Sequence, residues 1–365
     1  MNASQSATAR PPAAAGGTLL SIQALRGVAA MLVVVFHAAS FVAEHHGNTH
    51  EVFALGNAGV DIFFVISGFI MWKVTVRRPD GPGTFLLHRA IRLIPLYWFF
   101  TLLKALLAIA LPWEFPHFTL AASDLLLSLA FVPHIAPGSM HAMPVLAQGW
   151  TLNFEVFFYL LFSLALMVPT HRRLWAIGLM LGAGAAAGLA LAPAPVPAAG
   201  LLSPLLLEFL VGILIARLIG RNTPMPAWLC WGMVGAGGLL LLVADPAQFH
   251  DGARTWQYGI PAAMIVAGAV GAEMRGFFPS VPVLKRLGDA SYSIYLTHTF
   301  TVSVLGKLWR PGWPGWAFVA LAIVGSALVG VCVFRLIERP ITDALRRETR
   351  RATTAPLVSK QAPSG

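Results

Sequence analysis

An arginine and a histidine lie within an apolar stretch that is long enough to cross a bilayer. The stretch SIQALRGVAAMLVVVFHAAS covers residues 21–40 and contains Arg26 and His37. They are eleven positions apart, so on a helix they face the same side, about 16 Å apart along the axis. Ionisable groups in membrane helices usually face the bundle interior or a wet cavity. Alternatively, Arg26 reaches the membrane surface along its aliphatic stem and His37 bonds a neighbouring helix.

Two carboxylates lie within other apolar stretches. Asp61 belongs to GNAGVDIFFVISGFIMW, which also contains Ser67, and Glu155 belongs to GWTLNFEVFFYLLF. A charge at the centre of a membrane helix costs about 2.5–3.5 kcal/mol on insertion scales. We therefore expect both carboxylates to have partners. For Asp61 an ion pair that fixes packing is as good an interpretation as a functional one, whereas Glu155 favours function because it sits among Trp150, Asn153 and Tyr159.

Other apolar stretches of the sequence contain possible partners for these carboxylates. They are Arg26, His37 and His298, the last from the stretch SYSIYLTHTF. On a helix, the polar residues of this stretch share one arc. These residues are Ser291, Tyr292, Tyr295 and His298.

A basic group begins another apolar stretch, FLLHRAIRLIPLYWFF. It contains His88, Arg89 and Arg92, and the two arginines are one helical turn apart. Ordinary cytoplasmic flanking charge would explain them. The functional interpretation is a clamp for phosphate groups, because a planar guanidinium binds two oxygens at once. Pro95 follows and would kink the helix or free a backbone carbonyl.

The composition places these residues in a polytopic membrane protein. The chain has 365 residues, of which 57% are hydrophobic and only 11% charged, and its mean hydropathy is +0.72. Soluble domains carry about 25% charged residues. The two cysteines, Cys230 and Cys332, give no disulfide framework and no zinc motif.

The apolar pattern predicts an all-α bundle of about ten transmembrane helices and one re-entrant or surface segment. Residues 18–342 form the membrane domain, and disordered cytoplasmic tails cover 1–17 and 343–365. The short run 123–136 is the segment that does not cross. The predicted helices lie near 19–42, 52–73, 90–111, 149–168, 174–192, 201–219, 227–244, 256–274, 290–308 and 314–337.

Positive charge determines the expected orientation. The net charge is +10, and nearly all basic loops fall on one side if 123–136 does not cross. Both termini are then cytoplasmic. The charges are scattered over short loops, so they indicate topology and no nucleic-acid partner.

Five stretches, taken in order, resemble the acyltransferase-3 family of bacterial membrane O-acyltransferases. The stretches are LRGVAAMLVVVFHA, GVDIFFVISGF, RAIRLIPLYW, GWTLNFEVFFY and LGDASYSIYLTHTF. The sequences SGFIMW and PLYWFFTLL are similar to those of the branch of the family that acylates exopolysaccharides. The resemblance covers the chain from about residue 20 to 342.

The resemblance implies that an acyl group, usually acetyl, passes from cytoplasmic acyl-CoA to a sugar hydroxyl at the outer face. It implies acetyl-CoA as co-substrate and a surface polysaccharide or lipid-linked glycan as acceptor. It also implies a multi-pass protein of the bacterial inner membrane that works with other polysaccharide-synthesis proteins.

The resemblance also assigns roles. The family's transmembrane arginine and histidine correspond to Arg26 and His37, and its intramembrane glutamate corresponds to Glu155. The family's cytoplasmic arginine motif corresponds to Arg89 and Arg92, which we assign with His88 to the CoA phosphates.

The expected catalytic group is His37. It acts either as the general base for the sugar hydroxyl or as the carrier of the acyl group, and the sequence leaves both open. Asp61 or Glu155 would orient the imidazole, and Arg26 would stabilise the thioester region or a carboxylate. We expect a hydrated channel from the inner arginines to His37. The residues expected to line it are Ser67, Trp150, Asn153, Tyr292, Tyr295 and His298.

Two other classes of protein remain open. A proton-coupled transporter or a flippase of glycan precursors also uses buried charges, although no matching halves are visible. The second class is a protein without catalytic activity that serves as a structural partner in a polysaccharide-synthesis complex. We expect no bound metal. The outer-loop stretch EHHGNTHEV and the scattered residues His117, His134 and His141 match no helix-borne zinc site. The sequence does not determine the acceptor or the hydroxyl that is modified. It also leaves open whether the acyl group is acetyl, succinyl or longer, and what the oligomeric state is.

Overall fold

The computed structural model describes residues 19–45, 54–77, 80–115, 118–135, 143–191, 200–219, 225–244, 253–310 and 312–354. Within these ranges the regular structure is helical. The longer helices are Leu20–His45 (α1), Ala58–Arg77 (α2), Pro82–Ala110 (α3), Gly149–Leu166 (α5), Thr170–Leu191 (α6), Ser291–Leu308 (α11) and Gly315–Val333 (α12). The shorter ones are Ala122–Leu129 (α4), Leu206–Ile219 (α7), Ala227–Leu242 (α8), Ile260–Met274 (α9), Pro282–Asp289 (α10) and Arg339–Thr354 (α13).

Six helical segments in the described residues are long and apolar enough to cross a membrane. They are Leu20–His45, Leu55–Arg77, Pro82–Ala110, Gly149–Leu166, Thr170–Leu191 and Gly315–Arg351. The predicted count of ten crossings is not confirmed. Helices α7, α8 and α9 have 14, 16 and 15 residues, and at 1.5 Å per residue each is shorter than a bilayer core of about 30 Å.

The segment that we expected not to cross contains only the eight-residue helix α4. Eight residues span about 12 Å, less than half of a bilayer core. Helix α4 packs against α3. The Tyr97 hydroxyl of α3 donates a hydrogen bond to the Ser128 carbonyl at 3.1 Å, and the Trp98 indole donates one to the Leu129 carbonyl at 2.9 Å.

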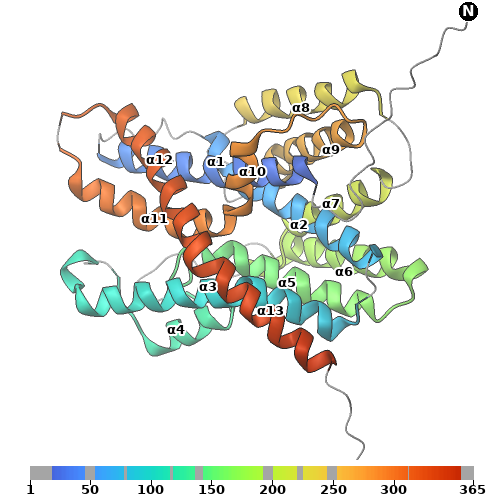
Figure 1. The fold of residues 1–365 in the computed structure, drawn as a ribbon, viewed down its shortest axis with the longest axis horizontal. Helices are drawn as coiled ribbons and strands as arrows, with labels where there is room; N and C mark the ends of the chain where they lie inside the picture. The colour runs from blue at the N-terminus through green and yellow to red at the C-terminus, as the bar shows by residue number, and fades with distance from the viewer. Residues whose placement is uncertain are drawn as a thin grey trace, which may run out of the picture.

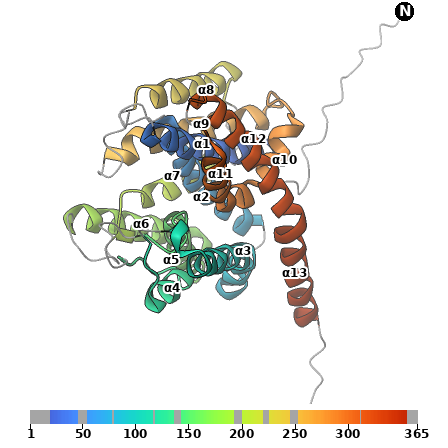
Figure 2. The same ribbon diagram turned by 90° about the vertical axis from the view of Figure 1, so that its left-hand side faces the viewer.

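The helices form two groups around a central pair. Helices α1 and α8–α12 lie on one side, α3–α6 on the other, and α2 and α7 between them (Figures 1 and 2). The close approach of α2 to α7 depends on two glycines. A Cβ at Gly68 would lie 2.0 Å from the Phe209 carbonyl oxygen, and one at Gly212 would lie 2.0 Å from that of Val65. Small residues let membrane helices touch backbone to backbone in this way.

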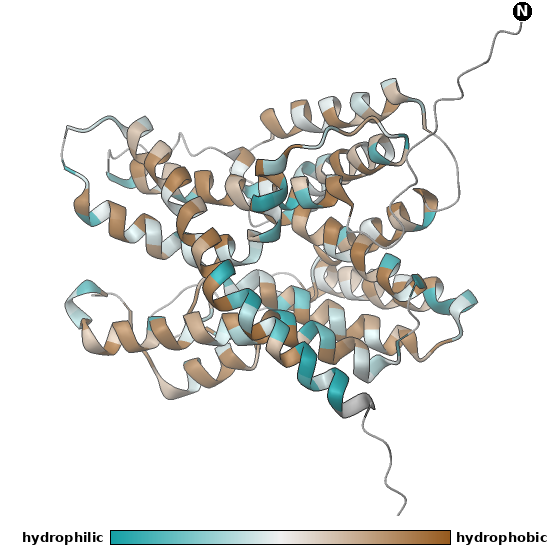
Figure 3. Ribbon diagram, in the orientation of Figure 1, coloured by the Kyte–Doolittle hydropathy of each residue, from teal (hydrophilic) through white to brown (hydrophobic). Residues whose placement is uncertain are grey.

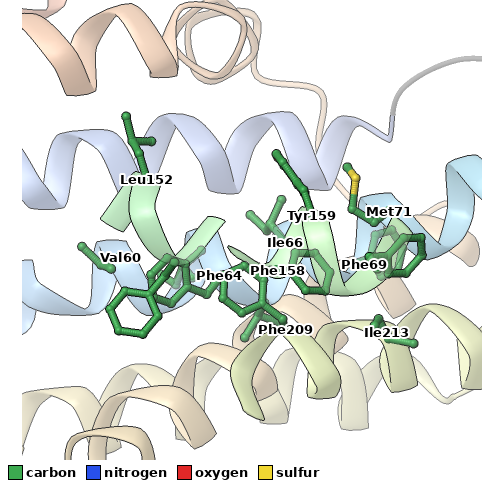
Figure 4. Packing of buried hydrophobic residues seen from close by; sticks show 14 of the residues in the cluster. Val60, Phe64, Ile66, Phe69, Met71, Leu152, Phe158, Tyr159, Phe209 and Ile213 are labelled. Atoms are coloured by element: carbon green, nitrogen blue, oxygen red, sulfur yellow. The ribbon is translucent and has the colours of Figure 1, made fainter. Parts of the chain in front are cut away.

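Aromatic rings fill the space where α5 meets that pair. Phe209 stacks on Phe64 with ring centroids 4.6 Å apart and on Phe158 at 4.4 Å, and Figure 4 shows the three rings together between the helices. Stacked rings of this kind add to the stabilisation from burial. They give the membrane bundle a packed core next to the site described below.

The chain after α12 departs from the sequence-based expectation. It continues through a wide helical turn, Phe334–Glu338, into α13. Residues 343–354 are therefore helical, although we expected a disordered tail from residue 343; residues 1–17 lie outside the described part. The hydrophilic α13 runs from one helix group towards the other beside α3, in contrast to the apolar α12 (Figure 3). Its alternation of polar and aliphatic residues suits a helix with one wet face.

Candidate active site

A cavity opens between α1, α2, α3, α5 and α11. Its empty space is about 820 Å³ including the open mouth. Four of its lining side chains are charged: Arg26, Arg89, Arg92 and Glu155. The other polar lining residues are Ser67, Thr151, Tyr159, Ser291, Tyr292 and Tyr295. The rest of the wall is apolar.

Arg26 is held in the cavity wall by neutral groups. It is only 8% exposed. Its Nη2 donates to the Ser291 hydroxyl at 2.8 Å and its Nη1 to the Gln23 side-chain oxygen at 3.3 Å. No carboxylate among the described residues lies within ion-pair distance of it. A buried cation with only neutral partners is costly, so this position suits an incoming anion.

Helix α3 supplies the other two arginines. It begins at Pro82, whose fixed backbone suits the first helical position, and its next turns carry Arg89 and Arg92 to the cavity. The buried Nε of Arg89 has no hydrogen-bond partner, and Arg92 has no ion pair within the described part of the chain. His88 points elsewhere: it lies outside the cavity, 3.5 Å from Asp80. Its position does not support the expected role in phosphate binding, because consecutive helical residues point about 100° apart.

Glu155 faces these arginines across the cavity. It accepts a hydrogen bond from the Ser67 hydroxyl at 3.0 Å and another from the Tyr159 hydroxyl. Two hydroxyl donors stabilise a carboxylate away from bulk water without neutralising it. The site therefore contains three arginines and one carboxylate, with space between them.

Asp61 does not pair with any of the cations that we expected. Its carboxylate lies 2.9 Å from the Nη2 of Arg254, and both side chains are buried. Arg254 also lies over the Trp150 ring, 5.7 Å from its centroid. Glu208 is buried beside this pair. Neither Asp61 nor Trp150 lines the cavity, so the expected role of Asp61 in orienting His37 has no geometric support.

His37 has a second imidazole as its neighbour. The ring centroids of His37 and His298 are 4.9 Å apart. The Nδ1 of the fully buried His298 donates to the Tyr295 carbonyl at 2.6 Å. Its Nε2 is then the acceptor of the neutral ring, and this atom has no partner among the described residues.

A family model described as an acyltransferase domain matches residues 19–335. The chain belongs to the acyltransferase-3 family. It is 37% identical to the exopolysaccharide production protein ExoZ of Rhizobium meliloti (strain 1021), over 90% of this chain and 100% of the relative. It is 27% identical to the acyltransferase MdmB of Streptomyces mycarofaciens, over 94% of this chain and 97% of the relative. No solved structure gives a significant match.

Membership of this family makes the chain an acyltransferase, as the sequence predicted. It also favours the enzyme over the transporter and the structural partner. The cavity is therefore a candidate site for the transfer of an acyl group.

In the described residues, the cavity that holds the arginines does not extend to His37. Phe63 and Tyr295 line the cavity, but neither His37 nor His298 does. The Tyr295 ring lies 6.1 Å from that of Phe63 and 5.8 Å from that of His298. The Tyr295 hydroxyl is held by Thr151 at 2.7 Å. Tyr295 therefore lines the cavity and also lies next to the His298 ring.

Of the remaining residues that we expected to line the channel, some line the cavity and others do not. Tyr292 lines the cavity, and its hydroxyl donates to the Leu93 carbonyl at 2.7 Å. Asn153 is buried outside the cavity, and its side-chain oxygen has no partner. Sequence reasoning did not assign Tyr159 to the site, although its spacing of four from Glu155 places both on one helix face.

The histidines outside the spans give no metal site in the described residues, where no three His, Cys, Asp or Glu side chains gather suitably. His45 bonds the Phe41 carbonyl at 2.9 Å and His134 the Val132 carbonyl at 2.9 Å. The other residues considered lie outside the described ranges. They are His46, His50, Glu51, His117 and His141.

Proposed function

We propose that this acyltransferase transfers an acetyl group from cytoplasmic acetyl-CoA to a hydroxyl of an exopolysaccharide or another cell-surface glycan. The observation that carries the proposal is the cavity with three arginines, none of which forms an ion pair with a carboxylate in the described residues. CoA carries several phosphate charges, and arginine is the residue that best binds phosphate in a desolvated site. The relative named for exopolysaccharide production supports a glycan acceptor.

In this proposal the arginines hold the carrier while the acyl end points towards His37. Arg89 and Arg92 bind phosphates, and Arg26 lines the cavity beside them. The sugar hydroxyl adds to the thioester carbon, its proton passes to an imidazole, the C–S bond breaks and the thiolate leaves. If His37 carries the acyl group, its ring nitrogen first bonds the acyl carbon as the C–S bond breaks and the thiolate leaves. The sugar hydroxyl then adds to that carbon and gives up its proton as the N–C bond breaks.

The histidine pair gives this chemistry a second group. The acceptor Nε2 of His298 can hold an N–H of His37 or take a proton from the acceptor hydroxyl. The neutral imidazole of His298 would then orient His37, in place of a carboxylate. Tyr295 and Phe63 must move aside for the acyl group to reach the pair. The enzyme would sit in the bacterial inner membrane with both termini cytoplasmic.

The test is acetyl transfer by the full chain in lipid nanodiscs, measured with isotopically labelled acetyl-CoA and the surface polysaccharide. His37→Ala should lower the rate at least a hundredfold, since general acid–base groups contribute about 10²–10⁴-fold. The matched control is His45→Ala, at the exposed end of the same helix, which should leave the rate unchanged. Wild-type rates in a folded His37→Ala protein would contradict the proposed mechanism.

A further inference from the structure

A second pocket adjoins the cavity on its charged side. It is formed by α1, α3, α10 and the junction of α12 with α13, and its empty space is about 620 Å³ including its mouth. Arg26 and Arg92 line both the pocket and the cavity. The two spaces therefore meet at these arginines. The pocket also receives Arg339 and Arg346 from α13.

Two of the three carboxylates of this pocket lie close to a cation. Asp289 accepts from the Gln23 amide at 2.6 Å and lies 3.6 Å from Lys285. Asp343 lies 3.7 Å from Arg339 on its own helix. The third, Glu338, accepts from the Ser293 hydroxyl at 2.6 Å and attracts Arg26 and Arg92 without forming an ion pair with either in the described residues.

Two cations of the pocket are left without such a partner. Neither Arg92 nor Arg346 has an ion pair within the described ranges. Arg346 also lies near enough to Arg89 for the two like charges to repel each other. An arrangement of facing guanidinium groups around empty space is stabilised when a polyanion enters it.

We propose that the second pocket binds the nucleotide end of acyl-CoA and that Arg346 of α13 contacts one of its phosphates. This proposal rests on the proposed function, because it takes acyl-CoA as the donor. The nucleotide end carries all the phosphates, whereas the pantetheine arm is uncharged and narrow. The arm passes between Arg26 and Arg92 into the cavity, and the acyl group lies in the apolar part of the wall. Helix α13 is thus part of the donor site.

The charges on α13 distinguish this proposal from a topological role. A cytoplasmic flanking helix needs positive charge at any position. Arg346 and Arg347 are adjacent and both exposed, but only Arg346 lines the pocket. Donor binding therefore requires one and not the other.

The experiment compares CoA binding by Arg346→Gln and Arg347→Gln variants of the full chain in nanodiscs, by isothermal titration calorimetry. We expect Arg346→Gln to bind CoA about tenfold more weakly, which corresponds to one lost charge-assisted contact. Arg347→Gln should bind like the wild type. In turnover, Arg346→Gln should raise KM for acetyl-CoA about tenfold with little change in kcat. Arg346→Lys should recover part of the binding because it restores the charge.

Different results would overturn different claims. Unchanged binding in Arg346→Gln, or equal losses in both variants, would refute the role of Arg346 while leaving acyl-CoA as the donor. Absence of CoA binding by the wild-type protein would instead refute the donor in the proposed function. The thermal midpoints of both variants should match the wild type, which separates lost contacts from unfolding.

Discussion

Two groups of charges are buried within the helices of this acyltransferase, and they are built differently. Around Asp61, the carboxylate and Arg254 are in direct contact and Glu208 packs beside them. Around Glu155, three arginines and a carboxylate line empty space without forming ion pairs. The first group is closed and the second is open.

The difference separates a structural role from a ligand-binding one. A closed ion pair satisfies its own charges, and removing one partner leaves the other buried and unpaired. An open group keeps charges available, and removing one of them leaves space that water can fill. We therefore expect substitutions in the closed group to change stability and substitutions in the open group to change donor binding.

The largest expected effect is on the closed group. Arg254→Met leaves Asp61 and Glu208 buried without their cation, which should lower the free energy of unfolding by about 3–5 kcal/mol. Denaturant titration in detergent measures it. The control is Arg310→Met, at an exposed position after α11, which should change stability by less than about 0.5 kcal/mol. Equal stability of Arg254→Met and the wild type would remove the structural role of this group.

A smaller effect is expected in the open group. Arg92→Gln removes one charge that faces both pockets, so KM for the acyl donor should rise about 10- to 100-fold, the equivalent of about 1.5–3 kcal/mol. The unfolding free energy should stay near that of the wild type. His88→Ala is the control, because His88 lies on the same helix but outside the cavity. A stability loss in Arg92→Gln as large as that in Arg254→Met would break the comparison.

The smallest effect should follow the loss of one hydroxyl donor within the open group. Tyr159→Phe removes a donor to Glu155 and should lower kcat/KM about fivefold, the equivalent of about 1 kcal/mol. Tyr97→Phe removes a similar bond to the Ser128 carbonyl, away from the cavity. Steady-state rates of the two variants should differ. If they agree, the hydrogen bond to Glu155 has no part in the reaction.

The sequence predicted the open group better than the closed one. Arg26, Arg89, Arg92 and Glu155 were visible because each is a charge in or beside a long apolar run. The order of these runs along the chain also indicated the family. What brings the four together is the packing of α1, α3 and α5, which a pattern of single residues does not contain.

An ion pair that fixes packing was one of two interpretations of Asp61, but its partners Arg254 and Glu208 were not predicted. Glu208 lies inside a predicted apolar span, 201–219. A carboxylate in such a span needs a partner, as was expected for Glu155, so a partner could have been expected for Glu208 as well. Arg254 precedes the predicted span 256–274 and read as a loop residue. Its partner Asp61 is 193 positions away, so the pairing depends on how α2 packs against the turn before α9.

The histidine pair shows the same limit at shorter range. His37 and His298 were both singled out, but His298 was expected along the substrate path. Only the packing of α11 against α1 places the two rings together. Tyr295, which lines the cavity next to His298, is an ordinary aromatic residue in an apolar helix and gives no signal of that position.

The glycine contact between α2 and α7 has a mechanical consequence. Backbone lies against backbone at Gly68 and Gly212, so we expect α2 and α7 to shift together rather than slide past each other. Helix α2 also supplies one wall of the cavity, from Val60 to Met71. We therefore expect any widening of the cavity during turnover to come from α3 and α11, which meet through the long side chain of Tyr292, and from rotation of the Phe63 side chain on α2.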